Sequence, residues 1–310
     1  MKALITGSEG FVGRYLRQEL ESCGHTVVRA DRVEGPGVRR VDLLDAPATE
    51  ALLEQERPDW IFHLAGQADI GLSWRKPRLT FELNILAALH VLEALRKADR
   101  RGVRVVIVGS SDQYGALGAD GQRVTEETPL RPSSPYAISK RAQEELAALY
   151  AGAYGLSVSM TRSFNHGGAG QRAGFMIPDF ASGIVRIERG LQRDLSVGNL
   201  AARRDFTHVR DIVRAYRLIA EKGAPGEVYN VGSGVTWSAG EILDRLIALA
   251  KVPVPVRQDP ARMRPSDSPV ICCDHAKLTR DTGWEPELPL DRILTDTLEW
   301  FRSRPDLSDC

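Results

Sequence analysis

Three side chains suited to proton transfer lie in the middle of the chain: Ser110, Tyr136 and Lys140. Tyr136 and Lys140 are four residues apart, so they would share one face of a helix. A lysine ammonium beside a phenol favours the phenolate, and we expect it to lower the pKa of Tyr136 from about 10. Such a phenol can pass a proton to or from a C–O group while hydride moves, and the Ser110 hydroxyl can hold the same oxygen.

A glycine pattern near the N-terminus predicts a binding site for a dinucleotide. Gly7 and Gly10 lie between an apolar run at residues 3–6 and a stretch of helical periodicity at residues 11–22, and Gly13 lies in the first turn of that stretch. In a strand–turn–helix, such glycines let a pyrophosphate approach the bare N–H groups at the helix N-terminus. We therefore expect the glycine turn to hold the diphosphate of a nicotinamide dinucleotide.

Asp31 follows the next expected strand, residues 26–30, and lies twenty-four residues after Gly7. A carboxylate at this place accepts hydrogen bonds from a ribose 2′-OH and repels a 2′-phosphate, which favours NAD(H). The adjacent Arg32 could offset that preference, so NADP(H) stays possible. The alternative is an exposed turn aspartate without a role in binding. We expect Asp42 to lie near the adenine of the cofactor.

The elements around these residues alternate between strand and helix. The expected strands are 3–6, 26–30, 60–65, 103–110 and 157–164, and the expected helices are 11–22, 48–56, 79–97 and 135–154. This alternation predicts an α/β fold with a Rossmann-type, doubly wound parallel sheet. Ser110 would then lie at the carboxyl edge of the sheet, where open α/β sheets bind ligands.

The alternation stops after residue 165, which predicts a smaller α/β lobe for the substrate. We expect residues 1–165 to form the NAD(P)-binding domain, with residues 205–232 returning to it through a helix at 209–221 and a strand at 227–231. Residues 166–204 and 233–310 would form the smaller lobe, with surface helices at 238–250 and 290–303. Residues 252–257 are expected to form an edge strand.

Composition narrows the class of protein. The net charge of +0 gives no electrostatic reason to expect nucleic acid or an anionic membrane as partner. No apolar run is long enough to span a bilayer, and the four cysteines have no CxxC spacing. The six histidines form no HExxH pattern, so no metal site is expected. A cytoplasmic enzyme fits these features best.

The chain as a whole resembles the extended short-chain dehydrogenase/reductase superfamily of the epimerase/dehydratase type. The matching segments include Gly7–Gly13, His63-Leu-Ala, Asn84, Ser110 with Tyr114-Gly115, Tyr136 with Lys140, residues 204–211 and residues 229–232. The resemblance implies that Ser110, Tyr136 and Lys140 are the catalytic residues. It implies cofactor contacts from Gly7, Gly10, Phe11, Val12, Gly13, Asp31, Arg32, Asp42, Leu43, Leu64, Ala65 and Asn84, besides Tyr136 and Lys140.

Within the superfamily, the segments after residue 161 are most similar to the reductases and 4,6-dehydratases of GDP-mannose-derived sugars. The likeness lies in residues 162–166, 171–181, 197–200 and 263–267. It implies that Ser111, Asn165, Val197, Arg204 and Arg264 bind a nucleotide-diphosphate sugar, with a GDP-linked sugar favoured. An arginine fork suits a diphosphate, and a surface ion pair is the alternative for either arginine.

Two departures from the family pattern bear on the reaction. Ala169 replaces a usual proline, and Asp112 stands where 4,6-dehydratases carry a glutamate base. Aspartate is one methylene shorter than glutamate, which reduces its reach to the C5 proton of a sugar. Asp112 is therefore either a catalytic base or polar support for the strand end.

These features predict that the chain reduces the C4 keto group of a GDP-4-keto-6-deoxy-hexose with NAD(P)H, with Tyr136 as general acid. The alternatives are a redox-neutral, NAD-dependent nucleotide-sugar 4-epimerase or 4,6-dehydratase, and a dinucleotide-binding sensor without catalysis. The resemblance also implies a homodimer formed through helices 79–97 and 135–154.

Overall fold

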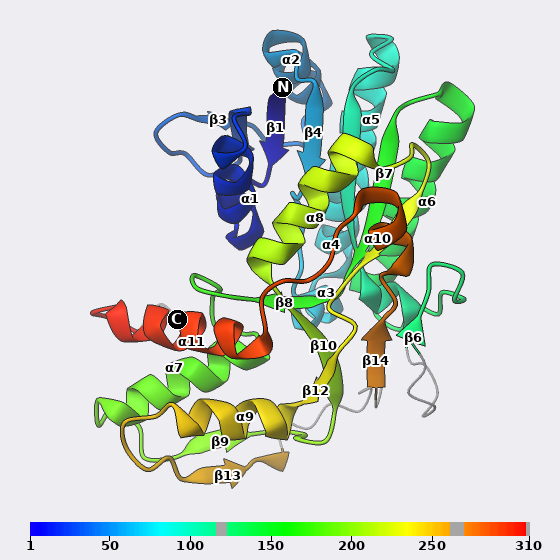
Figure 1. Cartoon of the computed structure of the whole chain (residues 1–310). Coiled ribbons are helices and arrows are strands. Elements are labelled where there is room, and N and C mark those ends of the chain that lie inside the picture. Colours follow the sequence, from blue (N-terminus) through cyan, green and yellow to red (C-terminus); the bar gives the residue numbers. More distant parts are fainter. Residues whose placement is uncertain (116–122, 261–269, 308–310) are drawn as a thin grey trace.

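The computed structural model describes residues 1–115, 123–260 and 270–307, and its main feature is a sheet of seven parallel strands (Figure 1). The strand order is β11-β7-β5-β4-β1-β2-β3. The strands are β1 (Lys2–Thr6), β2 (Thr26–Asp31), β3 (Val38–Arg40), β4 (Trp60–His63), β5 (Arg104–Ser110), β7 (Val158–Ser163) and β11 (Val228–Val231). The chain starts at β1 in the middle of this order, so the sheet is wound outward in both directions.

Helices cover both faces of this sheet, because neighbouring residues of each strand point into different cores. Ile61 of β4 packs into one core together with α2 (Ala46–Glu56), α5 (Ala87–Lys97) and α6 (Pro135–Tyr154). Phe62 points into the other core, against α1 (Phe11–Ser22) and α8 (Val209–Lys222). The doubly wound, Rossmann-type α/β fold is therefore confirmed.

The expected helix over residues 79–97 is interrupted. It begins as α4 (Pro77–Phe81), widens into the π-helical turn η1 (Glu82–Leu86) and continues as α5. The short helix α3 (Ile70–Arg75) precedes it. π-turns recur at functional sites, and this one places Asn84 in the protein interior, where it is 0% exposed.

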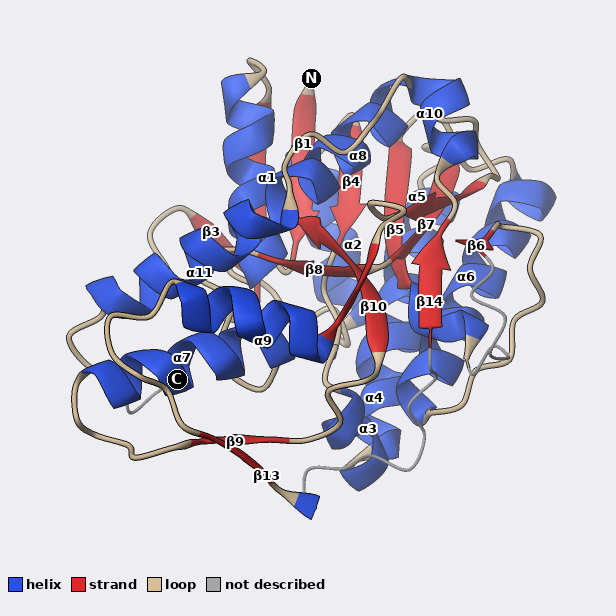
Figure 2. Ribbon diagram, turned by 60° about the horizontal axis from the view of Figure 1, so that its bottom comes forward, coloured by secondary structure: helices blue, strands red, loops and turns tan. Residues whose placement is uncertain are grey.

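A smaller group of elements lies beyond the carboxyl ends of the large sheet, below the strand arrowheads in Figure 1. Its helices α7 (Met176–Glu188), α9 (Ala239–Ala248) and α11 (Leu290–Ser303) share one apolar core, which also takes up the two-stranded pair β9 (Leu195–Val197) and β13 (Val256–Gln258). Figure 2 shows this pair along the outer edge of the group.

A second sheet connects this group to the large one. Its order is β12-β10-β14-β6, and β8 pairs with β10. The strands are β6 (Arg123–Val124), β8 (Asn165–Gly167), β10 (Arg203–His208), β12 (Thr236–Ser238) and β14 (Val270–Cys273), and the last short helix is α10 (Ala276–Thr282). Because β10 pairs here, the chain rejoins the large sheet layer only with α8 and β11 (Figure 2). The division into two lobes at the boundaries given above stays a prediction.

Three findings bear on the cellular setting. Over residues 1–115, 123–260 and 270–307, we find no helix long and apolar enough to cross a membrane. Within the same ranges, no group of His, Cys, Asp and Glu side chains is arranged to hold a metal ion. Cys23, Cys272 and Cys273 are free thiols. The cytoplasmic location stays a prediction.

Candidate active site

The predicted chemical residues meet at the carboxyl edge of the large sheet. Gly7 follows β1, Asp31 ends β2, His63 ends β4 and Ser110 ends β5. These four strands are neighbours, in the order β5-β4-β1-β2. This is the edge at which open α/β sheets bind ligands, so the fold gathers cofactor and catalytic candidates into one region.

The glycine turn leaves no space for larger residues. Gly7 has φ +71°, and a Cβ there would lie 2.8 Å from the backbone N of Ala65. A Cβ on Gly13 would lie 2.5 Å from the Gly7 carbonyl oxygen. Gly10 precedes α1 and carries no side chain to cap the N–H groups of the first helical turn. Bare amides at a helix N-terminus bind phosphate oxygens, so the turn fits a dinucleotide pyrophosphate.

Asp31 is tied to this turn. Its carboxylate accepts hydrogen bonds from the backbone N–H of Glu9 at 3.0 Å and of Val33 at 3.1 Å. Arg32 is exposed beside it. The remaining adenosine-side candidates lie along the same edge, with Asp42 exposed, Leu43 buried, and Phe11, Val12, Leu64 and Ala65 half-buried.

Tyr136 and Ser110 form the centre of the candidate site. Burial raises the pKa of the Tyr136 phenol above its ordinary value of 10.0, the negative charge of Asp112 raises it further, and a hydrogen bond with Ser110 lowers it. Ser110 Oγ also donates to Asp112 Oδ2 at 3.3 Å and accepts from the Asp112 N–H at 3.2 Å. The turn η2 (Ser111–Tyr114) therefore fixes the hydroxyl next to the phenol.

Lys140 lies one helical turn after Tyr136 in α6, as expected. Its ammonium donates to the Val108 carbonyl at 2.8 Å and to Gln143 Oε1 at 3.0 Å, and burial lowers its pKa to about 8. The expected lowering of the Tyr136 pKa by Lys140 is wrong for this structure, because burial outweighs the other influences on the phenol. The phenol therefore keeps its proton at neutral pH.

Asn84 supports the cofactor side of the site from within the protein. Its Oδ1 accepts the Gln67 N–H at 2.7 Å, and its Nδ2 donates to the Gln67 carbonyl at 3.1 Å and to Ser139 Oγ at 2.8 Å. Gly66, which precedes Gln67, approaches Asn84 so closely that a Cβ would lie 2.6 Å from Oδ1. Asn84 thus joins the loop after β4 to the helix of Tyr136 and Lys140.

The substrate-side candidates lie on several elements. Asn165 is exposed at the start of β8, opposite Phe206 of β10. Arg204 lies on β10 and donates to the Arg203 carbonyl at 2.7 Å. Ser111 is buried in η2 and Val197 is buried at the end of β9. Arg264 lies outside the described residues.

His166 connects β8, which carries the substrate candidate Asn165, to the glycine turn. Its ring stacks on Phe11, with centroids 6.4 Å apart and planes inclined by 5°. Because Phe11 follows Gly10 directly, the strand that carries Asn165 is held against the start of α1.

Sequence reasoning missed three polar residues behind Ser110. Gln113, Glu144 and Arg162 are each less than 9% exposed, and they form a hydrogen-bonded chain. The available signal was the spacing of Glu144, which lies four residues after Lys140 and therefore shares its helix face.

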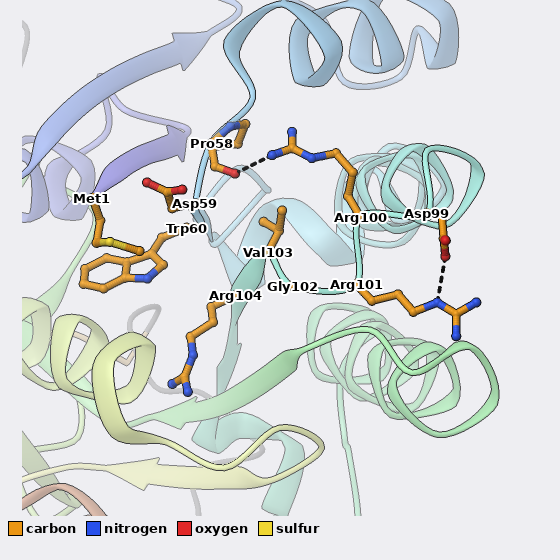
Figure 3. A pocket seen from close by; sticks show the side chains of 10 residues that line it. All are labelled: Met1, Pro58, Asp59, Trp60, Asp99, Arg100, Arg101, Gly102, Val103 and Arg104. Carbon is orange, nitrogen blue, oxygen red and sulfur yellow. Dashed lines mark hydrogen bonds and ion pairs between the residues drawn. The ribbon is translucent and has the colours of Figure 1, made fainter.

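A cavity of about 310 Å³ lies at the opposite edge of the sheet, where β4 and β5 begin with Trp60 and Arg104 (Figure 3). All three of its arginines are engaged: Arg100 donates to the Pro58 carbonyl at 2.9 Å, Arg101 to Asp99 at 2.7 Å and Arg104 to the Ala220 carbonyl at 3.0 Å. This cavity is separate from the candidate site, because Ser110 lies at the other end of β5.

The doubly wound sheet, the glycine turn and the Ser–Tyr–Lys set together define an enzyme of the extended short-chain dehydrogenase/reductase class. The chain belongs to the GDP-mannose 4,6 dehydratase family, whose model matches residues 4–297.

Individual relatives agree with this family. The chain is 36% identical to GDP-6-deoxy-D-mannose reductase of Pseudomonas aeruginosa over 304 residues, which cover 98% of each chain. It is similar to the structure of RMD from Pseudomonas aeruginosa complexed with NADPH, with TM-score 0.88 and 33% identity over 97% of this chain and 99% of that one. It is also similar to UDP-glucose 4-epimerase of Thermus thermophilus in complex with NAD, with TM-score 0.87 and 29% identity over 98% and 99%.

Proposed function

We propose that this chain reduces the C4 keto group of a GDP-4-keto-6-deoxy-hexose, with a nicotinamide dinucleotide as hydride donor. The observation that carries the proposal is the buried phenol of Tyr136, hydrogen-bonded to Ser110 at the carboxyl edge of the sheet. The likeness to GDP-6-deoxy-D-mannose reductase supports the choice of reaction and substrate.

The proton on the phenol suits Tyr136 to the role of general acid. Ketone reduction needs a group that donates a proton to the oxygen, whereas alcohol oxidation needs a group that accepts one. Burial and Asp112 both raise the pKa of Tyr136, so the phenol carries a proton at neutral pH. Ser110 orients the substrate oxygen, and the Lys140 ammonium, one helical turn after Tyr136, adds positive charge to the same end of α6.

The residues at the glycine turn fit a nicotinamide dinucleotide. The close approach of Gly7 to Ala65 and of Gly13 to Gly7 leaves bare backbone at the start of α1. When bound, the cofactor supplies the hydride. The chain supplies the glycine turn for the diphosphate, Asp31 for the ribose, and Tyr136 with Lys140 on the catalytic side.

We place NAD(H) ahead of NADP(H), since the Asp31 carboxylate would repel a 2′-phosphate. NADP(H) is the alternative cofactor, because the similar structure from Pseudomonas aeruginosa is a complex with NADPH. The dissociation constants of NADH and NADPH, measured by fluorescence for the wild type and Asp31→Ser, test this preference. Weaker NADH binding in the variant supports it, and tighter NADPH binding by the wild type contradicts it.

We propose that the nucleotide sugar binds between the carboxyl edge of the large sheet and the second sheet. Asn165, Arg204 and Arg264 are the candidate ligands, because arginine forks and an amide suit a diphosphate and its sugar. Ser111 and Val197 complete the candidate set.

A redox-neutral 4,6-dehydratase is the second candidate function, favoured by the carboxylate of Asp112 next to Ser110. The two reactions are separated by incubating the purified protein with GDP-4-keto-6-deoxymannose and NADPH or NADH. Oxidation of one cofactor per product supports the reductase. A second incubation contains GDP-mannose. If the reduced cofactor is not oxidised in the first incubation, and GDP-mannose is converted to the keto sugar in the second, the dehydratase is supported.

We also propose that the chain forms a homodimer in which α4, α5 and α6 pack against the same helices of a second copy. The outer side of α4 and η1 carries an apolar groove lined by Phe81, Ile85 and Leu86, and Leu149 of α6 is 58% exposed. Light scattering tests this assembly: the wild type should have the mass of two chains, and Leu149→Glu the mass of one.

A further inference from the structure

Two buried charged side chains, Arg162 and Glu144, lie behind the turn that follows Ser110 and are hydrogen-bonded to its residues Tyr114 and Gln113. We infer that Arg162, Glu144 and Gln113 are positioning residues that fix the Ser110 turn through a chain of hydrogen bonds. This inference rests on the proposed function, because it gives these residues a role in the reaction of Ser110 and Tyr136.

The chain starts with a buried ion pair between the sheet and the catalytic helix. Arg162 of β7 donates from Nε to Glu144 Oε2 at 3.0 Å and from Nη2 to Glu144 Oε1 at 2.7 Å. The side chains are 7% and 9% exposed. Such a two-pronged pair has a fixed geometry, so it locks α6 against β7 at the level of the catalytic helix turn.

Gln113 links this ion pair to Ser110 by hydrogen bonds. Its Nε2 donates to Glu144 Oε2 at 2.7 Å, and its Oε1 accepts the backbone N–H of Ser110 at 3.2 Å. The amide therefore bridges a charged carboxylate and the backbone of Ser110. Gln113 is 0% exposed, so no water from the bulk competes for these bonds.

A second contact holds the other end of the same turn. Arg162 Nη1 donates to the Tyr114 hydroxyl at 3.0 Å and to the Glu126 carbonyl at 2.8 Å, and the Tyr114 hydroxyl donates to Asn230 Oδ1 at 2.7 Å. Ser110 and Tyr114, at the two ends of the turn, are thus both connected to one guanidinium.

Stability alone does not account for this arrangement. A buried ion pair loses so much hydration that well-packed apolar residues often stabilise a fold as well or better. What the pair provides here is a fixed direction for the hydroxyl next to Tyr136. Displacement of a catalytic group by about 1 Å can lower a rate about 100-fold.

The first test removes the bridge. Gln113→Leu should lower kcat for GDP-4-keto-6-deoxymannose reduction by about 10- to 100-fold, while KM changes less than about threefold. Hydrogen–deuterium exchange of the peptide that spans residues 109–115 should become faster. The exchange measurement requires no substrate, so it reports on the turn even if the protein catalyses a different reaction.

The second test changes the charge and keeps the shape. In Gln113→Glu, the new carboxylate faces Glu144, and the two can hydrogen-bond only while they share a proton. We therefore expect a fall in kcat with rising pH in addition to the fall above about pH 8 that the Lys140 ammonium gives the wild type. Gln113→Glu combined with Glu144→Gln returns an amide donor to the pair but leaves Arg162 one acceptor oxygen instead of two, so it should remove the extra pH dependence without restoring the full kcat.

The matched control is another buried pair in the smaller group of elements. Glu188 of α7 binds Arg302 of α11 by two hydrogen bonds, with side chains 8% and 13% exposed. Glu188→Gln should lower the melting temperature with kcat and the 109–115 exchange unchanged.

The outcomes separate the inference from the proposed function. Wild-type kcat and exchange rate in Gln113→Leu would overturn the positioning role. Equal loss of kcat in Glu188→Gln would also overturn it, because the effect would then be general destabilisation. A wild type that does not reduce the keto sugar, with exchange in residues 109–115 still faster in Gln113→Leu, overturns the proposed function alone.

Discussion

The side chain of Asn84 donates a hydrogen bond to Ser139 Oγ at 2.8 Å and so joins the π-turn of one helix to the helix that carries Tyr136 and Lys140. Ser139 in turn donates to the Tyr136 carbonyl at 2.7 Å. Asn84 is therefore connected through Ser139 to the backbone of Tyr136, the proposed proton donor. The π-helical turn that carries Asn84 directs its amide into the protein interior, whereas a regular α-helix would direct it differently.

Replacing Tyr136 with phenylalanine removes the proton donor and keeps the ring. We expect Tyr136→Phe to lower kcat by about 100- to 10,000-fold, with the dissociation constant for NADH little changed. Steady-state kinetics and fluorescence titration check the two parts. Tyr154→Phe on the same helix is the control, since this ring is 43% exposed at the far end of α6. Full activity in Tyr136→Phe would contradict catalysis by this residue and favour a dinucleotide sensor.

The activity should depend on the protonation of Lys140. Burial lowers the pKa of this lysine to about 8, so its ammonium is present below that pH and is lost above it. We expect kcat/KM to fall above about pH 8, by up to about tenfold per pH unit. The Tyr136 phenol cannot produce this limb, because its pKa is raised instead.

Lys140→Met supplies the comparison for this pH profile. Its activity should be low and show no limb near pH 8, since the titrating group is gone. A limb retained in Lys140→Met would assign the titration to another group.

Replacing Asp112 should distinguish a reductase from a dehydratase. Its charge raises the pKa of Tyr136, and its carboxylate accepts a hydrogen bond from Ser110. Asp112→Asn keeps an acceptor for Ser110 and removes the charge. We expect keto-sugar reduction to stay within about tenfold of the wild type, whereas a reaction that needs a carboxylate base would lose about 100-fold or more. Kinetics at one pH with both substrates measure the difference.

The glycine turn can be tested without substrate. Gly13→Ala would place a Cβ 2.5 Å from the Gly7 carbonyl oxygen, and such overpacking costs about 1–3 kcal/mol. We expect a lower melting temperature and weak NADH binding. Gly152→Ala is the control, since its Cβ meets nothing within 4 Å in α6 and should stabilise the helix by about 1 kcal/mol. NADH binding at wild-type strength in Gly13→Ala would contradict a diphosphate site here.

The large sheet was predictable because its strands and helices each carry a strong local signal. The apolar run of β5 and the helical spacing of α1 and α6 set their bounds within a residue. The second sheet was missed, since strands as short as β6 or β12 have two or three residues and no measurable period. The π-turn at Glu82–Leu86 was also missed, because its apolar residues fit a regular helix equally well.

The candidate site was predictable only where spacing along the chain carried the information. Tyr136 and Lys140 were found because four residues make one helical turn. The link from Glu144 to Gln113 was not, because the two residues meet only after α6 packs on β5 and η2. The pKa of Tyr136 was predicted in the wrong direction, since the extent of its burial depends on the same packing.

The last strand of the large sheet has a consequence for synthesis of the chain. β11 pairs with β7 along Val228–Val231, so the sheet is completed only after all intervening residues have been made. Until then, the hydrogen-bonding groups on one side of β7 stay open to other strands, including those of a second molecule. A shortened chain that ends before residue 228 should therefore aggregate, although it contains the glycine turn, Ser110, Tyr136 and Lys140.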